Sequence, residues 1–289
     1  MTIAAAVGPA RRRARIAYLL LLPGIAWLAI FFIIPLISLF FTSLQVSTGS
    51  SGKYKAGFNW RNYVEALSEY WEFFLRALIY AGFATVLALV IAYPLAYFIA
   101  LKAGRWRALM LVLVVAPFFA SFLLRTYAWK TILADDAVIT QTLNALHLLP
   151  DGRILNTSIA VIAGLTYNFL PFMILPLYAA LDKIDPRLIE AGSDLYASPF
   201  TTFRKVTWPL SMPGVVAGTL LTFIPAAGDY INAELLGSTK DKMIGNAIQT
   251  NFIEFRDYPM ASALSFILMA SILIIVTVYI RRAGTEELV

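Results

Sequence analysis

The sequence predicts an all-α polytopic membrane protein with six transmembrane helices. Of its 289 residues, 60% are hydrophobic and 14% are charged, whereas soluble domains carry about 25% charged residues to cover a surface that faces water. The charged residues leave six long apolar intervals, each close to or above the ~20 residues that a helix needs to cross ~30 Å of hydrocarbon. These intervals do not alternate between apolar and polar residues, which excludes membrane-spanning strands.

The predicted spans cover about residues 16–41, 77–101, 108–129, 158–181, 210–234 and 258–280. Their limits follow the charged residues, because a charge near the bilayer centre costs about 2.5 to 3.5 kcal/mol on insertion scales. The first span contains Pro23 and Pro35. It is longer than the apolar region of a signal peptide and no small-x-small site ends it, so we interpret it as an uncleaved helix.

The other five spans are justified by uncharged runs of different lengths. The second has 25 residues between Arg76 and Lys102, and the third has 17 residues before Arg125. The third reaches residue 129 only if Arg125 snorkels or faces a pathway. The last three rest on uncharged runs of 28, 23 and 23 residues, at 154–181, 206–228 and 258–280.

The distribution of basic residues predicts the orientation. Six spans place both termini on one side, and that side holds 13 Lys and Arg residues against 8 on the other, with Arg76 and Arg125 at span edges. Because cytoplasmic loops retain positive charge, both termini are expected in the cytoplasm. A transmembrane domain at 16–282 then lies between a basic cytoplasmic tail at 1–15 and a short tail at 283–289. No nucleic-acid partner is expected, because the basic excess lies in asymmetric loops.

The sequence has few residues suited to metal or nucleophile chemistry. It contains no Cys, and its single histidine, His147, leaves nothing for a histidine cluster. Thiolate metal sites and cysteine nucleophiles are thereby excluded. We therefore rank a membrane enzyme last among the functional classes and expect His147 to be a surface residue.

Residues 182–212 form a cytoplasmic segment with helix signals of its own. Asp185-Pro186 and Ser198-Pro199 each combine an N-cap residue with Pro at the first helical position. The apolar residues Leu188, Ala191 and Leu195 follow at helical spacing. We expect a hairpin whose second helix runs from Pro199 to about Val206, before Pro209 and Pro213 delimit the return to the membrane. It either lies on lipid or inserts into a groove of a soluble partner.

The hairpin sequence carries a resemblance to a known family. The runs Glu190-Ala191-Gly192-Ser193-Asp194-Leu195-Tyr196-Ala197-Ser198 and Val206-Thr207-Trp208-Pro209 resemble the EAA loop of permease subunits of binding-protein-dependent ABC importers. The match departs at Gly192, the third motif residue, at Trp208, which replaces a Leu, and at Tyr196, which replaces a Gly. If that position needs a positive φ, a Tyr there costs about 1 kcal/mol or more. Stretches at 121–129, 167–178 and 223–237 are similar to permeases of the spermidine/putrescine group.

The resemblance implies a type I ABC importer permease fold with a cytoplasmic coupling-helix hairpin, in the cytoplasmic (inner) membrane. It implies as partners a second permease, an ABC ATPase homodimer, an extracytoplasmic substrate-binding protein, the lipid bilayer and a polyamine substrate. The hairpin residues implied to couple to the ATPase are Glu190, Ala191, Gly192, Asp194, Tyr196, Ala197 and Pro209. No G-x-x-x-x-G-K-[ST] run occurs, so the chain is expected to be no enzyme and to bind no cofactor, with ATP and Mg held by the ATPase subunits.

A polyamine pathway should offer carboxylates to ammonium groups and aromatic faces to cations. Asp229 lies about 24 Å above Pro213 at 1.5 Å per residue, so we expect it in the outer part of the fifth span with Tyr230 and Glu234. Trp129, Tyr167 and Asn168 are further candidates. Alternatively the helix ends at Gly228 and both acids are solvated.

Three other questions stay open in the sequence. Arg125 could repel cations or pair with Asp229, and Asp135 and Asp136 are expected in an outer vestibule, where negative potential concentrates a cation. An importer of another solute, such as sulfate, iron or phosphonate, would carry a related hairpin. A secondary transporter or channel could use the same intramembrane acid, but it would need neither ATP nor the hairpin.

Overall fold

The computed structural model describes residues 20–47, 53–147, 149 and 152–283. The predicted tail 1–15, the first four residues of the first span and residues 284–289 lie outside this description. Within it the chain is almost wholly helical, with one antiparallel pair of two-residue strands, β1 (Val46–Ser47) and β2 (Tyr54–Lys55). Five described helices are long and apolar enough to cross a membrane, or six if a bent pair counts as one span. The all-α polytopic class is confirmed.

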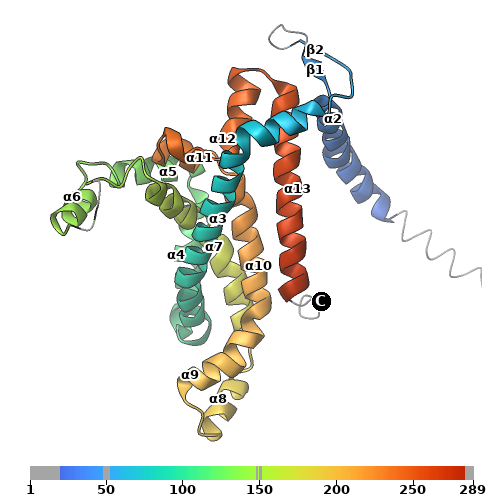
Figure 1. Ribbon diagram of the computed structural model, residues 1–289. Coiled ribbons are helices and arrows are strands. Elements are labelled where there is room, and N and C mark those ends of the chain that lie inside the picture. The colour runs from blue at the N-terminus through green and yellow to red at the C-terminus, as the bar shows by residue number, and fades with distance from the viewer. Residues whose placement is uncertain (1–19, 48–52, 148, 150–151, 284–289) are drawn as a thin grey trace, which may run out of the picture.

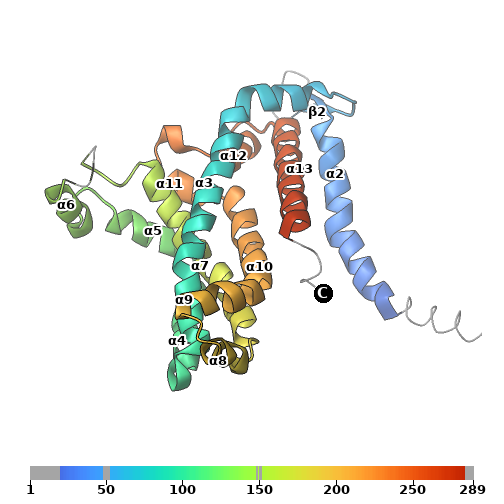
Figure 2. The same ribbon diagram turned by 60° about the horizontal axis from the view of Figure 1, so that its bottom comes forward.

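The first helix runs from Leu20 to Ser43 without a break. Its π-helical turn η1 (Ala29–Ile33) continues into α2 (Ile34–Ser43). Pro35 lacks an N–H and its ring clashes with the carbonyl of Phe31, so the hydrogen-bond register shifts and the Ile34 N–H bonds the Ala29 carbonyl. Its α2 part packs against α13 (Tyr258–Ala283), and toward Leu20 the helix diverges from α13 at the edge of the molecule (Figures 1 and 2).

Three helices form the centre of the molecule: α3 (Arg61–Leu101), α7 (Ser158–Asp182) and α10 (Trp208–Ala227). Helix α3 has 41 residues and begins 16 residues before the predicted span. Figure 1 shows that its first part bends over one end of the bundle. The prediction found only the apolar part, because a charged residue ends a membrane span while Glu and Arg remain good helix formers.

Small residues let the central helices approach closely. Helix α3 buries a stripe of alanines at 77, 81, 84, 88, 92 and 96. On α10, a Cβ added at Gly214 would lie 2.6 Å from the Ala180 Cβ and 2.7 Å from the Pro176 carbonyl oxygen. Such small-residue contacts are typical of membrane helices, whose association depends on close packing.

The third predicted span is not one helix, so the prediction of a single helix over 108–129 is wrong. A short turn η2 (Gly104–Trp106) leads into α4 (Arg107–Val115) and η3 (Ala116–Phe119), and α5 (Phe122–Ile132) then turns away at 94°. Pro117 cannot donate a backbone hydrogen bond, and the chain is extended at Ala120 and Ser121. Helix α6 (Val138–Ala145) follows α5 away from the bundle (Figure 1).

The fifth predicted span also differs, at both ends. After α8 (Pro186–Asp194), one continuous helix runs from Pro199 to Ala227 through α9 (Pro199–Thr202), η4 (Phe203–Thr207) and α10. The predicted end of the second hairpin helix near Val206, with Pro209 and Pro213 delimiting the return to the membrane, is wrong. The π-helical turn η4 accommodates Pro209 as η1 accommodates Pro35, and Pro213 lies inside α10.

At its far end α10 stops at Ala227, so residues 210–234 are not one span. A separate helix α11 (Ile231–Leu236) follows, then η5 (Thr239–Asp241), α12 (Ile244–Gln249) and η6 (Thr250–Glu254), which lead into α13. Helices α11 and α12 lie at the opposite end of the molecule from α8 and α9 (Figure 1). Each end has its own buried apolar cluster, and α3, α7 and α10 contribute to both.

Candidate functional site

Helices α8 and α9 form the hairpin that the sequence predicts, and both predicted helix starts are confirmed. The Arg187 N–H donates to the Asp185 carboxylate at 2.9 Å, and the Thr201 N–H donates to the Ser198 hydroxyl at 3.2 Å. Helix α8 ends with Tyr196 at φ +55° and the Ala197 N–H bonded to the Gly192 carbonyl. This is a Schellman ending, a position that normally favours Gly.

Gly192 makes the contact between the two hairpin helices possible. A Cβ added there would lie 2.7 Å from the Thr202 Oγ1 and 2.9 Å from its Cγ2. The departure from the EAA pattern at Gly192 therefore has a local reason, since Thr202 occupies the space that a side chain at residue 192 would need.

The hairpin buries one set of apolar side chains and exposes another. Ile184 is buried and Ile189 packs against the same cluster at this end of the bundle. The exposed residues are Leu188 at 48%, Phe200 at 72%, Leu195 at 81% and Tyr196 at 99%. Figure 1 shows the hairpin projecting beyond the helical bundle. We call these four residues the hairpin tip.

The other predicted hairpin residues occupy three places. Glu190, Ala191 and Asp194 are exposed on α8. Ala197 contributes the backbone N–H that closes the turn. Pro209 lies in the first turn of α10, beside η4 and outside the hairpin tip.

At the opposite end, a polar network joins three helices. The Asn168 amide of α7 donates to the Asn232 Oδ1 of α11 at 3.0 Å and to the Thr126 hydroxyl of α5 at 3.2 Å. The Asn232 N–H donates to the Asp229 carboxylate at 2.8 Å. Asp229 is 8% exposed and the other three residues are buried. The Asn168 Oδ1 and the Asn232 Nδ2 are both buried and have no hydrogen-bond partner among the described residues, so the network is not fully satisfied.

The alternative that the helix ends at Gly228 and leaves Asp229 solvated is confirmed in its first part and wrong in its second. The helix does end before Asp229, as the alternative states, with Gly228 as its C-cap. Asp229 is nevertheless buried, and it accepts a backbone hydrogen bond near the start of α11 in the manner of an N-cap.

The Glu234 side chain and the Tyr230 backbone carbonyl contact Lys242 or Asn246 and not the polar network. The Glu234 carboxylate lies 3.5 Å from the Lys242 Nζ and accepts from the Asn246 amide at 2.9 Å. The same amide donates to the Tyr230 carbonyl at 3.0 Å. The structure therefore does not join Asp229 and Glu234 into one carboxylate pair.

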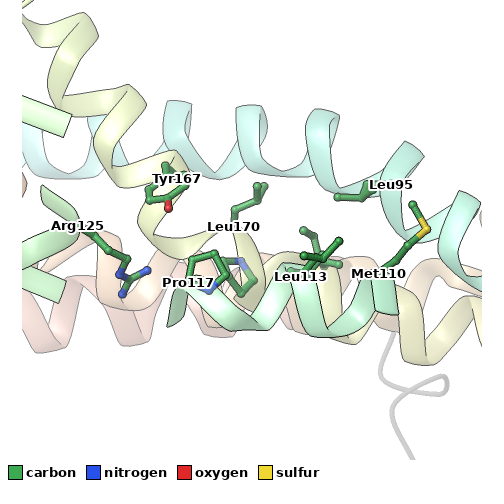
Figure 3. Close-up of a pocket in the computed structure, with 10 residues that line it drawn as sticks. Leu95, Met110, Leu113, Pro117, Arg125, Tyr167 and Leu170 are labelled. Carbon is green, nitrogen blue, oxygen red and sulfur yellow. The ribbon is translucent and has the colours of Figure 1, made fainter. Parts of the chain in front are cut away.

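The rings of Trp129 and Tyr167 are in edge contact, with centroids 5.3 Å apart. Tyr167 also lines a cavity of about 350 Å³ between α3, α4 and α7, and Arg125 stands at one end (Figure 3). Most of the remaining lining is apolar: Leu95, Met110, Leu113, Val114, Pro117, Leu170, Pro171 and Ile174. The structure thus brings Trp129 and Tyr167 into contact between α5 and α7, the two helices that also carry Thr126 and Asn168 of the polar network.

Arg125 is buried and does not pair with Asp229. No ion pair joins these two residues, both of which the structure describes. The Arg125 guanidinium lies 5.6 Å from the ring centroids of Phe118 and of Phe122, and its Nε has no hydrogen-bond partner among the described residues. A buried cation among aromatic rings raises the local potential at this end of the cavity.

Reasoning from the sequence missed four residues of these contacts: Thr126, Asn232, Lys242 and Asn246. Asn232 could have been found, because an Asp three residues before it is an N-cap signal for a short helix. Lys242 and Asn246 carry no such local signal, since their contacts with Glu234 arise from the packing of α12 against α11.

The chain is similar to known membrane transport proteins over almost its whole length. Residues 2–283 match the family described as binding-protein-dependent transport system inner membrane component. The spermidine/putrescine transport system permease protein PotB of Haemophilus influenzae is 39% identical over 89% of this chain and 90% of the relative. PotB of Escherichia coli K12 is 36% identical over 90% of this chain and 94% of the relative.

A solved structure shows the same fold. A chain of a bacterial ABC transporter involved in the import of the acidic polysaccharide alginate superposes with a TM-score of 0.67. The alignment covers 94% of this chain and 96% of that one, at 19% identity. At that identity the likeness concerns the fold alone.

Proposed function

The chain belongs to the family of binding-protein-dependent transport system inner membrane components, and from that premise we propose that it is a polyamine permease. It is a multi-pass inner-membrane transport protein. In the proposed function, it forms the pathway for spermidine or putrescine together with a second permease. A binding protein delivers the substrate from outside, and an ABC ATPase homodimer drives the cycle with ATP and Mg, so this chain needs no cofactor of its own.

The observation that carries the proposed substrate is the identity of 39% and 36% to two spermidine/putrescine permeases, over nearly the full length of both chains. The polar network agrees with a cationic substrate. Asp229 supplies a carboxylate and Asn168 an acceptor oxygen without a partner among the described residues, and α5 and α7 also carry the paired rings of Trp129 and Tyr167. Carboxylate and aromatic faces are the groups that attract alkylammonium ions.

Arg125 supports a particular route for this substrate. Its charge at the end of the apolar cavity repels a polycation, and the cavity offers few polar groups in compensation. We therefore place the ammonium groups on the side of Asp229 and Asn168, with Tyr230 and Glu234 nearer the entrance. In this arrangement Arg125 keeps the polycation out of the apolar cavity.

The hairpin tip supports docking of the ATPase. Its four apolar side chains are exposed in the chain by itself, and a projecting amphipathic helix is a common element for insertion into a partner's groove. Because the ATPase is cytoplasmic in the proposed function, the hairpin end and both termini lie on the cytoplasmic side, and α11 and α12 lie near the outer surface. Glu190 and Asp194 then flank the docked face.

The test is uptake of radiolabelled spermidine or putrescine by proteoliposomes that contain the complete importer, with ATP inside and binding protein outside. We expect Asp229→Asn to lower uptake at least tenfold and to leave ATPase assembly intact. Glu254→Gln is the matched acid-to-amide control, because Glu254 is exposed, and it should transport normally. Uptake by the Asp229→Asn importer at the wild-type rate would show that the pathway assignment is wrong.

A second arm separates the proposed function from its alternatives. Glu190→Ala should uncouple ATP hydrolysis from the permeases, so that binding protein with polyamine no longer stimulates the ATPase. Uptake of sulfate, iron or phosphonate, with no uptake of polyamine, would assign another solute. If the chain alone accumulates substrate from an ion gradient without ATP, it is a secondary transporter and the proposal fails.

A further inference from the structure

Four aromatic side chains gather where the hairpin joins the bundle. Tyr93 of α3 contacts both Phe203 of η4 and Trp208 of α10, with ring centroids 5.7 Å and 5.2 Å away. Tyr97, one turn further along α3, contacts Phe203 at 6.4 Å. These rings are the place where the continuous helix from Pro199 to Ala227 touches α3 next to the hairpin.

Tyr93 also makes a buried hydrogen bond to α10. Its hydroxyl lies 2.7 Å from the Ser211 Oγ, and Ser211 in turn donates to the Trp208 carbonyl at 3.0 Å. Because the single Ser211 proton is used toward Trp208, Tyr93 is the donor to Ser211. Tyr93 is 7% exposed and Ser211 is fully buried. Because both residues are buried, an unmade bond there would leave both hydroxyls poorly compensated.

The contacts from the hairpin tip to α3 are continuous. Gly192 of α8 lies against Thr202, the last residue of α9, and Phe203 follows directly and contacts Tyr93. Phe203 is the first residue of the π-helical turn η4, which joins α9 to α10, and π-helical turns are frequent at functional sites. Closely packed side chains shift together rather than deform, so these contacts can transmit a displacement of the hairpin to α3.

We propose that Tyr93 is a positioning residue that fastens the hairpin to α3, so that α3 and α10 move with the hairpin as one body when the ATPase displaces it. Its hydrogen bond to Ser211 and its ring contacts with Phe203 and Trp208 form the fastening. This inference rests on the proposed function, because it assumes that an ATPase acts on the hairpin tip.

The first test measures coupling in the complete importer in proteoliposomes. The readout is the number of polyamine molecules imported per ATP hydrolysed, in Tyr93→Phe, Ser211→Ala and the double variant. Loss of one buried hydrogen bond changes an equilibrium by about two- to tenfold, so each single variant should lower the ratio by about that factor. The double variant should fall no further, since both substitutions remove the same bond. Tyr97→Phe is the matched control and should keep the wild-type ratio.

The outcomes distinguish a failure of the proposed role of Tyr93 from a failure of the proposed transport function. If wild type imports polyamine with ATP and Tyr93→Phe keeps its ratio, the inference is overturned and the proposed function stands. Full additivity of the two single variants would overturn it as well, because the hydroxyls would then act independently. If wild type shows no ATP-driven polyamine import, the proposed function fails first.

A distance measurement tests the rigid body directly. The chain has no cysteine, so spin labels can be placed at two introduced cysteines, Arg187→Cys on α8 and Lys102→Cys at the end of α3, in an importer with cysteine-free partners. We expect one distance, unchanged between the nucleotide-free and ATP-bound states, and a broader or shifted distribution when Tyr93→Phe is added. A wild-type distance that changes with ATP would overturn the inference, whatever the transport ratio.

Discussion

Replacing Tyr196 tests the energetic cost of the hairpin turn. Tyr196 has φ +55°, a left-handed conformation, which costs a residue with a Cβ about 1 to 2 kcal/mol. Tyr196→Gly removes that cost, but the greater freedom of Gly in the unfolded chain offsets it by about 0.5 to 1 kcal/mol. Relative to Tyr196→Ala, which keeps the Cβ, the glycine variant should stabilise the folded hairpin by about 0.5 to 1 kcal/mol.

The assay is hydrogen–deuterium exchange of the amides that close the turn. The Leu195 N–H bonds the Ala191 carbonyl at 3.1 Å and the Ala197 N–H bonds the Gly192 carbonyl at 3.0 Å. In Tyr196→Gly these amides should exchange about two- to fivefold more slowly than in Tyr196→Ala, as the smaller opening equilibrium requires. Equal exchange in the two variants, or faster exchange in the glycine variant, would refute the argument from backbone strain.

The same pair of variants separates folding from docking. The Tyr196 side chain is 99% exposed, so its loss should not destabilise the isolated chain. If Tyr196 anchors the ATPase, both variants should weaken ATPase binding by a similar factor, about tenfold or more for an aromatic anchor. Wild-type affinity in both variants would remove Tyr196 from the docking surface.

Two further predictions concern close packing at glycines. Gly192→Ala should destabilise the hairpin by about 1 to 3 kcal/mol, because its Cβ would lie 2.7 Å from the Thr202 Oγ1. Adding Thr202→Ala should restore the protection of the hairpin amides in hydrogen exchange. A double variant that is no better protected than Gly192→Ala would contradict this contact. Gly214→Ala should lower the thermal unfolding temperature, because the new Cβ would lie 2.7 Å from the rigid Pro176 carbonyl. Its control is Gly82→Ala on α3, where an added Cβ meets nothing within 4 Å. This control substitution should stabilise the helix by about 0.5 to 1 kcal/mol.

Much of the fold followed from the spacing of charges and from local start signals. Helix α7 covers Ser158–Asp182 where the sequence indicates 158–181, and α13 begins at Tyr258 as expected. The caps at Asp185 and Ser198 were readable because each is a local contact between a side chain and a nearby backbone N–H.

The predicted helix boundaries are wrong where a proline rule that considers one segment alone was applied to a boundary that depends on tertiary packing. Pro209 and Pro213 were expected to separate the second hairpin helix from the fifth span, but a π-helical turn accommodates Pro209 and the helix continues, while near Pro117 the chain does bend sharply. The same residue type gives both results because the outcome depends on the neighbouring helices against which each segment packs. A pattern within one segment does not contain that information.

The sequence by itself determined that this is a membrane protein, that it is helical and that it carries an amphipathic hairpin, because these properties follow from the residues of each segment and their spacing. Only the tertiary structure decided which polar residues meet, such as Asp229 with Asn232 and Asn168, and that Glu234 turns to Lys242. It also decided that Tyr93 reaches Ser211, 118 positions away. Such contacts depend on how separate helices pack, and the energy that selects one packing is shared among residues far apart in the chain.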